Sequence, residues 1–180
     1  AIQFPSLPEP AATSLDDEAN CRRNSTEGFP ENSTKGPHMT MPERLLDKEF
    51  LIFDCQATES RPDKGDILEL AWLRFHAADP LETYQSRIVS TLIRLPDGQK
   101  IPRQVKRVTG LRDEDLADGT PLESAWLQLM TTVSEIRSRH PGPCPTIIHF
   151  ARYEGPYLQH LHQRFAADQP FPFDILCTYK

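Results

Sequence analysis

The feature that most constrains the fold is a short apolar run, Phe50-Leu51-Ile52-Phe53, which polar residues follow at once. Four residues are too few for a helix, and an unbroken apolar run of this length is typical of a strand buried on both faces of its sheet. Such a strand needs helices to cover the sheet. The run therefore predicts a layered α/β domain.

Periodicity and turn residues predict the remaining elements. Strands are expected at 67–75, 84–95 and 146–150, helices at 102–108, 122–139 and 153–165, and a strand or helix start at 174–177. The helix over 122–139 has the clearest pattern, because Trp126, Leu129 and Val133 recur at helical spacing before a Pro-Gly-Pro break. The first three strands read as an antiparallel meander. The order β-β-β-α-β-α predicts a mixed sheet flanked by helices.

The first 42 of the 180 residues are polar and broken by prolines, with no apolar period. We expect them to form a disordered tail or extension, and residues 43–180 to form one domain. No secretory signal or long apolar segment is visible in the sequence, which predicts a soluble, cytoplasmic protein that does not enter a membrane. Four cysteines without a Cys-x-x-Cys pair argue against a zinc ribbon.

Acidic residues follow two of the predicted strands. Asp54 comes directly after the first strand, and Glu154 opens the helix after the strand at 146–150. A sheet edge is a common place for metal ligands, because the strands hold the backbone firmly there. Asp54 is equally explained as a turn or cap residue, and Glu154 as a favourable charge at a helix N-terminus. Position alone does not decide between these roles.

Three motifs together resemble those of the DEDD-type 3′–5′ exonucleases, the superfamily of the proofreading subunit of bacterial DNA polymerase III. The first, at 53–58 and 67–71, is similar to Phe-Asp-x-Glu-Thr-Thr-Gly followed by Ile-x-Glu-Ile-Ala/Gly. The segment 105–111 is similar to the connecting element Val-x-x-Ile-Thr-Gly-Ile, and 149–158 resembles the second motif, His-Asn-Ala-x-Phe-Asp-x-x-Phe-Leu. The motifs occur in the family's order.

The resemblance implies an RNase H-like fold that hydrolyses the 3′ ends of DNA or RNA with two Mg²⁺ or Mn²⁺ ions. In this sequence the matching catalytic and metal-ligand positions are Asp54, Gln56 and Glu154. The family's third motif is expected beyond Lys180, so the domain is expected to be C-terminally truncated and weak or inactive by itself. A polymerase or another replication or repair protein is a possible partner.

Two of the three positions depart from the family pattern. Gln56 stands where the family has Glu, which removes one negative charge from a site that attracts its cation electrostatically. Glu154 stands where the family has Asp, and the extra methylene shifts the carboxylate. Glu59 lies where the family has Gly and is an alternative source of an acidic group. These departures predict weaker metal binding.

The candidate nucleic-acid contacts are Thr58, Arg107, Phe150 and Tyr153. Arg107 belongs to a basic cluster that a solvated helix face would explain equally well; its other members are Arg103, Lys106 and Arg112. Aromatic residues beside a strand are more often core residues, and His149 is expected to be buried and hydrogen-bonded. His160 and His162 have the wrong spacing for a metal clamp.

Two functions remain open. One is metal-dependent 3′–5′ exonuclease activity, which Asp54 and Glu154 favour. The other is a catalytically degenerate exonuclease fold that binds nucleic acid or a protein, which Gln56 favours. A net charge of −6 does not separate them, because a local basic patch can exist on an acidic protein. Both require that positions 54, 56 and 154 converge in the fold.

Overall fold

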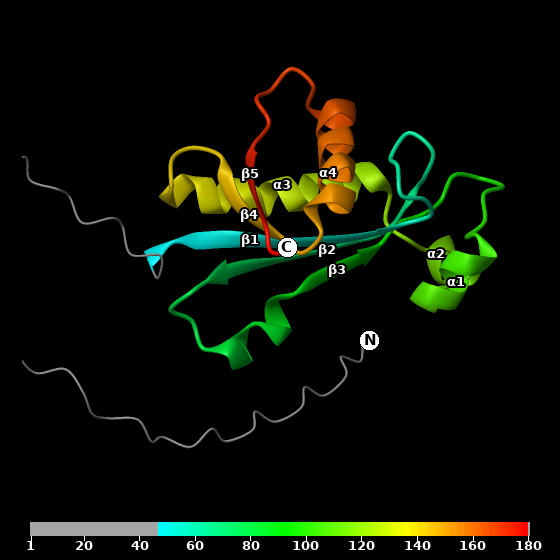
Figure 1. Ribbon diagram of the computed structural model, residues 1–180, viewed down its shortest axis with the longest axis horizontal. Helices are drawn as coiled ribbons and strands as arrows, with labels where there is room; N and C mark the ends of the chain where they lie inside the picture. Colours follow the sequence, from blue (N-terminus) through cyan, green and yellow to red (C-terminus); the bar gives the residue numbers. More distant parts are fainter. Residues whose placement is uncertain (1–46, 180) are drawn as a thin grey trace, which may run out of the picture. The chain divides into compact units, whose positions relative to one another are not determined.

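The computed structural model describes residues 47–179. They form a five-stranded mixed sheet with helices packed against it (Figure 1). The predicted tail, and its boundary at residue 42, lie outside the described residues. None of the helices in the described part has the length and apolar character needed to cross a bilayer.

The elements follow the predicted order, with two short helices between the third and fourth strands. They are β1 Glu49–Ala57, β2 Ile67–His76, β3 Val89–Leu92, α1 Arg103–Thr109, α2 Asp113–Ala117, α3 Leu122–Arg139, β4 Cys144–Ile148, α4 Ala151–Phe165 and β5 Phe173–Cys177. Two 3₁₀ turns, Leu81–Thr83 and Gln85–Arg87, precede β3. The strand order is β3-β2-β1-β4-β5.

The sheet combines a meander with parallel strands. β1 pairs antiparallel with β2, and β2 pairs antiparallel with β3, as predicted. β4 pairs parallel with β1, and β5 pairs parallel with β4. The predicted α/β class and the RNase H-like arrangement are therefore confirmed. Because β1 and β4 are parallel neighbours, the residues that follow them emerge at the same edge of the sheet.

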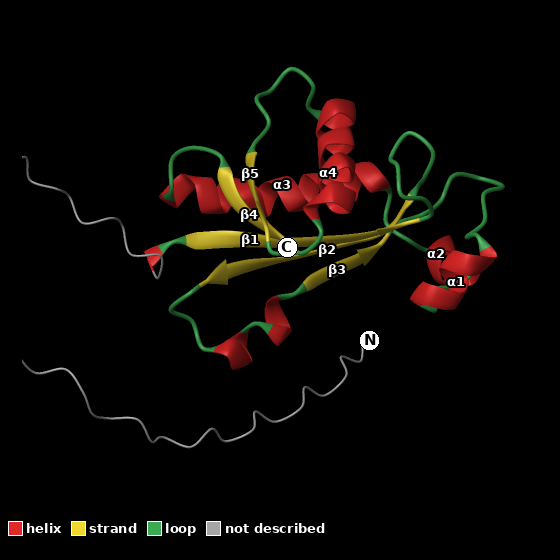
Figure 2. Ribbon diagram, viewed as in Figure 1, coloured by secondary structure: helices red, strands yellow, loops and turns green. Residues whose placement is uncertain are grey.

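The core lies between one face of the sheet and the helices α3 and α4 (Figure 2). Alternate β1 residues, Leu51, Phe53 and Cys55, enter it together with Trp126 and Leu129 of α3. α3 and α4 cover one face only, so the prediction that β1 is buried on both faces holds only at its start, where Phe50 on the other face is 6% exposed. Ile52 is half-buried on the other face, and Asp54 is exposed there. This second face carries the candidate site.

Several boundaries differ from the predictions. The first strand was expected to end at Phe53, but β1 continues to Ala57, so the prediction that Asp54 follows the strand is wrong and Asp54 lies inside it. The third strand was expected from Tyr84, but Tyr84 is buried between the two 3₁₀ turns, where its hydroxyl donates to the carbonyl of His76. β3 therefore begins later and is shorter. The fourth strand ends at Ile148, and α4 starts two residues earlier than expected, because the carbonyl of Phe150 accepts the backbone N–H groups of Tyr153 and Glu154.

Candidate active site

Asp54 and Gln56 share the sheet face that α3 and α4 leave open. They alternate along β1 with the buried residues Phe53, Cys55 and Ala57, and neighbouring residues of a strand point to opposite faces. Asp54 is exposed, and Gln56 is half-buried. The amide oxygen Oε1 of Gln56 is buried without a hydrogen-bond partner. An unpartnered buried oxygen of this kind is a free ligand position.

Glu154 reaches the same place from the first turn of α4. Its side chain is only 6% exposed, and its oxygen Oε2 is buried without a hydrogen-bond partner. When protonated, the Glu154 carboxyl shares a hydrogen bond with Asp54. Two acidic side chains that are distant in the sequence are thus brought together by the parallel pairing of β1 with β4. The structure therefore places Asp54 and Glu154 next to each other, which the prediction of a shared site requires.

The carboxyl pair is electrostatically strained. Burial is the main reason why the pKa of Glu154 rises to about 8, and the hydrogen bond with Asp54 and its negative charge add to the effect. Burial also raises the pKa of the Cys55 thiol well above its usual value, with smaller contributions from Glu154 and Asp54. Near neutral pH the pair therefore holds a proton, which a bound cation would displace.

The loop between β1 and β2 is fastened beside the pair. Thr58 and Asp66 close it, because the Thr58 backbone N–H donates to the Asp66 carbonyl and the Asp66 backbone N–H donates to the Thr58 hydroxyl oxygen, both at 2.9 Å. The hydroxyls of Tyr153 and Tyr157 both donate to the carbonyl of Glu59, at 3.2 and 2.7 Å. Thr58 and Tyr153, which were predicted to contact nucleic acid, thus form hydrogen bonds that hold this loop. The side chain of Glu59 is exposed.

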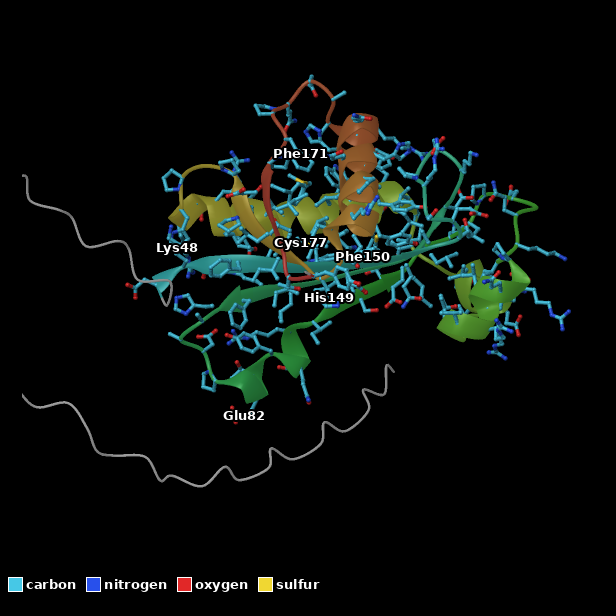
Figure 3. All side chains as sticks on the ribbon, viewed as in Figure 1. Lys48, Glu82, His149, Phe150, Phe171 and Cys177 are labelled. Carbon is cyan, nitrogen blue, oxygen red and sulfur yellow. The ribbon has the colours of Figure 1, made fainter. Side chains whose placement is uncertain are left out.

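Exposed aromatic rings lie at the start of the helix that carries Glu154. Phe150 is 40% exposed and Tyr179 is 58% exposed, with ring centroids 5.0 Å apart in an edge-to-face arrangement. His149 is exposed rather than buried, because it follows the end of β4; its Nδ1 lies 3.1 Å from the Thr178 hydroxyl (Figure 3). Tyr179 was not among the predicted contacts, because its position beside Phe150 depends on the pairing of β5 with β4.

Two of the four residues of the predicted basic cluster form ion pairs with neighbouring acidic residues. Lys106 pairs with Asp113 at 2.6 Å, and Arg112 pairs with Asp115 at 3.0 Å. Arg107 is exposed on α1 and has no ion pair within the described chain. Arg103 lies one helical turn before it and is likewise exposed. The cluster therefore offers two available cations rather than four.

A cavity of about 430 Å³ lies at the opposite end of β1 from Asp54. It is lined by Glu49, Arg74, His76, Asp79, Arg87 and Arg139. Its arginines are engaged in ion pairs, since Glu49 accepts from Arg74 and Arg139, and Asp79 accepts from Arg87. These internal pairs leave the cavity without a strong net charge. It is not part of the candidate site.

The donors around Asp54 are of the type that hard divalent cations prefer. Two carboxyl groups and the orphaned oxygen of Gln56 provide oxygen ligands and negative charge. Within residues 47–179, no three His, Cys, Asp or Glu side chains gather closely enough to hold a metal ion. The described residues thus fit part of a cation site, with an amide oxygen in place of a third carboxylate.

Solved structures with the same arrangement were found by comparison. The zinc-bound complex of E. coli exonuclease I with single-stranded DNA superposes with a TM-score of 0.57 at 9% identity, over 73% of this chain and 28% of that one. The complex of the same enzyme with a dA13 oligonucleotide gives 0.56 at 9% identity, over 74% and 28%. The chain shares the fold of exonuclease I.

A product-bound structure of exonuclease I agrees, with a TM-score of 0.52 at 12% identity over 73% of this chain and 30% of that one. The chain therefore spans less than a third of the enzyme that it resembles. No protein-family model matches the sequence, and no curated protein matches it significantly. At this identity the likeness to exonuclease I shows the fold, an RNase H-like α/β arrangement, and not the activity.

Proposed function

We propose that this domain belongs to a 3′–5′ exonuclease of the DEDD superfamily that acts on single-stranded nucleic acid and uses a divalent cation. The observation that carries the proposal is the meeting of Asp54 with the buried Glu154. The same fold in exonuclease I, which the comparisons include in complex with single-stranded DNA, supports it.

The predicted site residues would have different roles in the reaction. Asp54, Glu154 and the Gln56 amide oxygen would hold the cation, which when bound activates water and stabilises the departing 3′ oxygen. The exposed ring of Phe150 would stack on a base near the 3′ end, because every base offers a π-face. Arg107 would contact a backbone phosphate. Thr58 and Tyr153 would act by holding the loop that borders the site.

The cation would be Mg²⁺ or Mn²⁺, since oxygen donors favour both. The two-ion arrangement stays a prediction, because within residues 47–179 no three His, Cys, Asp or Glu side chains gather closely enough to hold even one ion. The closer resemblance to the proofreading subunit of DNA polymerase III, and a polymerase partner, also stay predictions.

A catalytically degenerate binding module is the second candidate. Gln56 favours it, because an amide in place of a carboxylate leaves the site with less negative charge. Such a module would keep its affinity for single strands after the cation is removed and would release no nucleotides.

The test is digestion of a 3′-labelled single-stranded DNA by the whole protein that contains this chain, in Mg²⁺ or Mn²⁺. We expect EDTA to stop the reaction and Asp54→Asn to lower the rate by at least about a hundredfold. Asp168→Asn, in an exposed loop, is the matched control. Equal rates for both variants would contradict the proposed site, and binding without any digestion would favour the second candidate.

A further inference from the structure

Glu69 is a buried acidic residue beside the candidate site. It lies on β2 and pairs directly with Gln56 of β1 across the antiparallel ladder. Residues paired in this way point to the same face of a sheet. Glu69 therefore shares the face of Asp54 and Gln56, and its side chain is only 6% exposed.

Among residues 47–179, the buried Glu69 carboxylate has a hydroxyl partner and no cationic one. Its Oε1 accepts a hydrogen bond from the Ser90 hydroxyl on β3. No Lys, Arg or His within residues 47–179 forms an ion pair with Glu69, Asp54 or Glu154. Buried carboxylates are normally paired with a cationic side chain or bind a metal ion.

Other atoms on the same face also lack partners. Oε1 of Gln56 and Oε2 of Glu154 are both buried without a hydrogen bond. Glu154 is more than nine-tenths buried and is directed at Asp54. Asp54, Glu69 and the orphaned amide oxygen of Gln56 thus share one face of the sheet, Glu154 reaches Asp54 from α4, and none of the three acids has an ion pair among residues 47–179. Carboxylate and amide oxygens are the donors that hard divalent cations prefer.

We propose that Glu69 is a further carboxylate ligand of this cation site and supplies the negative charge that Gln56 lacks. The inference rests on the proposed function. β2 lies between β3 and β1, so rotation of the Glu69 side chain can transfer its carboxylate from Ser90 on one neighbouring strand toward Gln56 on the other. In the described state it faces Ser90, which explains why three acidic groups are not yet gathered.

The test compares Mn²⁺ binding by isothermal titration calorimetry in five forms of the whole protein: the unchanged protein, three variants at positions 56 and 69, and Asp54→Asn. We expect Glu69→Gln to weaken binding by at least about tenfold, and Gln56→Glu to strengthen it, because cation affinity follows the charge of the ligands. The double variant Gln56→Glu with Glu69→Gln exchanges the two groups. It should bind within about threefold of the unchanged protein.

The inference is overturned if Glu69→Gln binds Mn²⁺ as the unchanged protein does, or if the double variant binds as tightly as Gln56→Glu alone. If Glu69→Gln does not fold, the double variant decides, because it keeps one carboxylate and one amide at the two paired positions. Asp54→Asn distinguishes the role of Glu69 from the proposed function. If Mn²⁺ binding is lost with Asp54→Asn but not with Glu69→Gln, only the role of Glu69 is refuted. Unchanged binding in both refutes the proposed function itself.

Discussion

Replacing Glu154 with Gln should make the domain more stable at neutral pH while removing its cation affinity. The pKa of Glu154 lies at about 8 in the folded protein, against an ordinary value of 4.5. A group whose pKa is raised by folding stabilises the protein fully below pH 4.5, and that contribution is lost as the pH rises toward 8. The sign follows from the extra proton that the folded state binds.

The magnitude follows from the two pKa values. In this interval one such group changes the free energy of unfolding by about 1.4 kcal/mol per pH unit. Between pH 5 and pH 7.5 the unchanged protein should therefore lose about 3 kcal/mol that Glu154→Gln does not lose. This is a large share of a domain's stability.

Urea unfolding followed by circular dichroism in EDTA, at pH 5 and pH 7.5, measures the effect. The difference between the two proteins isolates Glu154, because every other titrating group is common to both. Glu82→Gln, at an exposed position, is the matched control and should behave as the unchanged protein does. Parallel pH profiles for the unchanged protein and Glu154→Gln would refute the buried carboxyl pair.

Adding Mn²⁺ at pH 7.5 extends the experiment. A cation at a hundred times its Kd stabilises a protein by about 2.7 kcal/mol. The unchanged protein should gain this stability, and Glu154→Gln should gain much less, because it lacks one of the charged ligands.

Three further predictions concern binding and the core. Phe150→Ala should weaken binding of single-stranded DNA in EDTA by about 1–3 kcal/mol, and Phe150→Trp should preserve it, as fluorescence anisotropy would show. Arg107→Ala should lower the salt dependence of that binding by about one unit of slope, whereas Arg112→Ala, already paired, should change it little. In urea unfolding, Trp126→Ala should cost about 3–5 kcal/mol because the ring is 2% exposed, and Leu127→Ala, at 60% exposure, under about 0.5 kcal/mol.

The long helix was predictable to the residue because local signals mark both ends. Pro121 precedes its first residue, and Pro141 and Gly142 follow its last turn. The third strand was not predictable in the same way. Tyr84 reads as a strand residue by propensity, but its packing against Phe75, with ring centroids 4.8 Å apart, holds it in a turn. That contact joins β2 to the turn before β3, and local sequence does not encode it.

In the candidate site, too, local sequence patterns predicted some residues, whereas strand pairing determines the place of another. Asp54 and Glu154 were found from local patterns, an acid next to an apolar run and an acid opening a helix, although Asp54 lies inside β1 rather than after it. Glu69 was visible only as part of a motif, since its alignment with Gln56 depends on the register of β1 and β2. That register shifts at a bulge between Gln56 and Ala57, and a slip of one residue reverses the face on which a side chain lies.

The carbonyl of Glu59 accepts two hydroxyls from α4, and this has a mechanical consequence. Tyr153 and Tyr157 tie the helix that bears one acid to the loop that leaves the strand bearing the other. Fluctuations of these two segments should be correlated, so their spacing would persist even when the surrounding chain loosens. Without the Tyr153 and Tyr157 hydroxyls, Asp54 and Glu154 would move independently of each other. Affinity for a divalent cation would then decrease although the ligand residues themselves were unchanged.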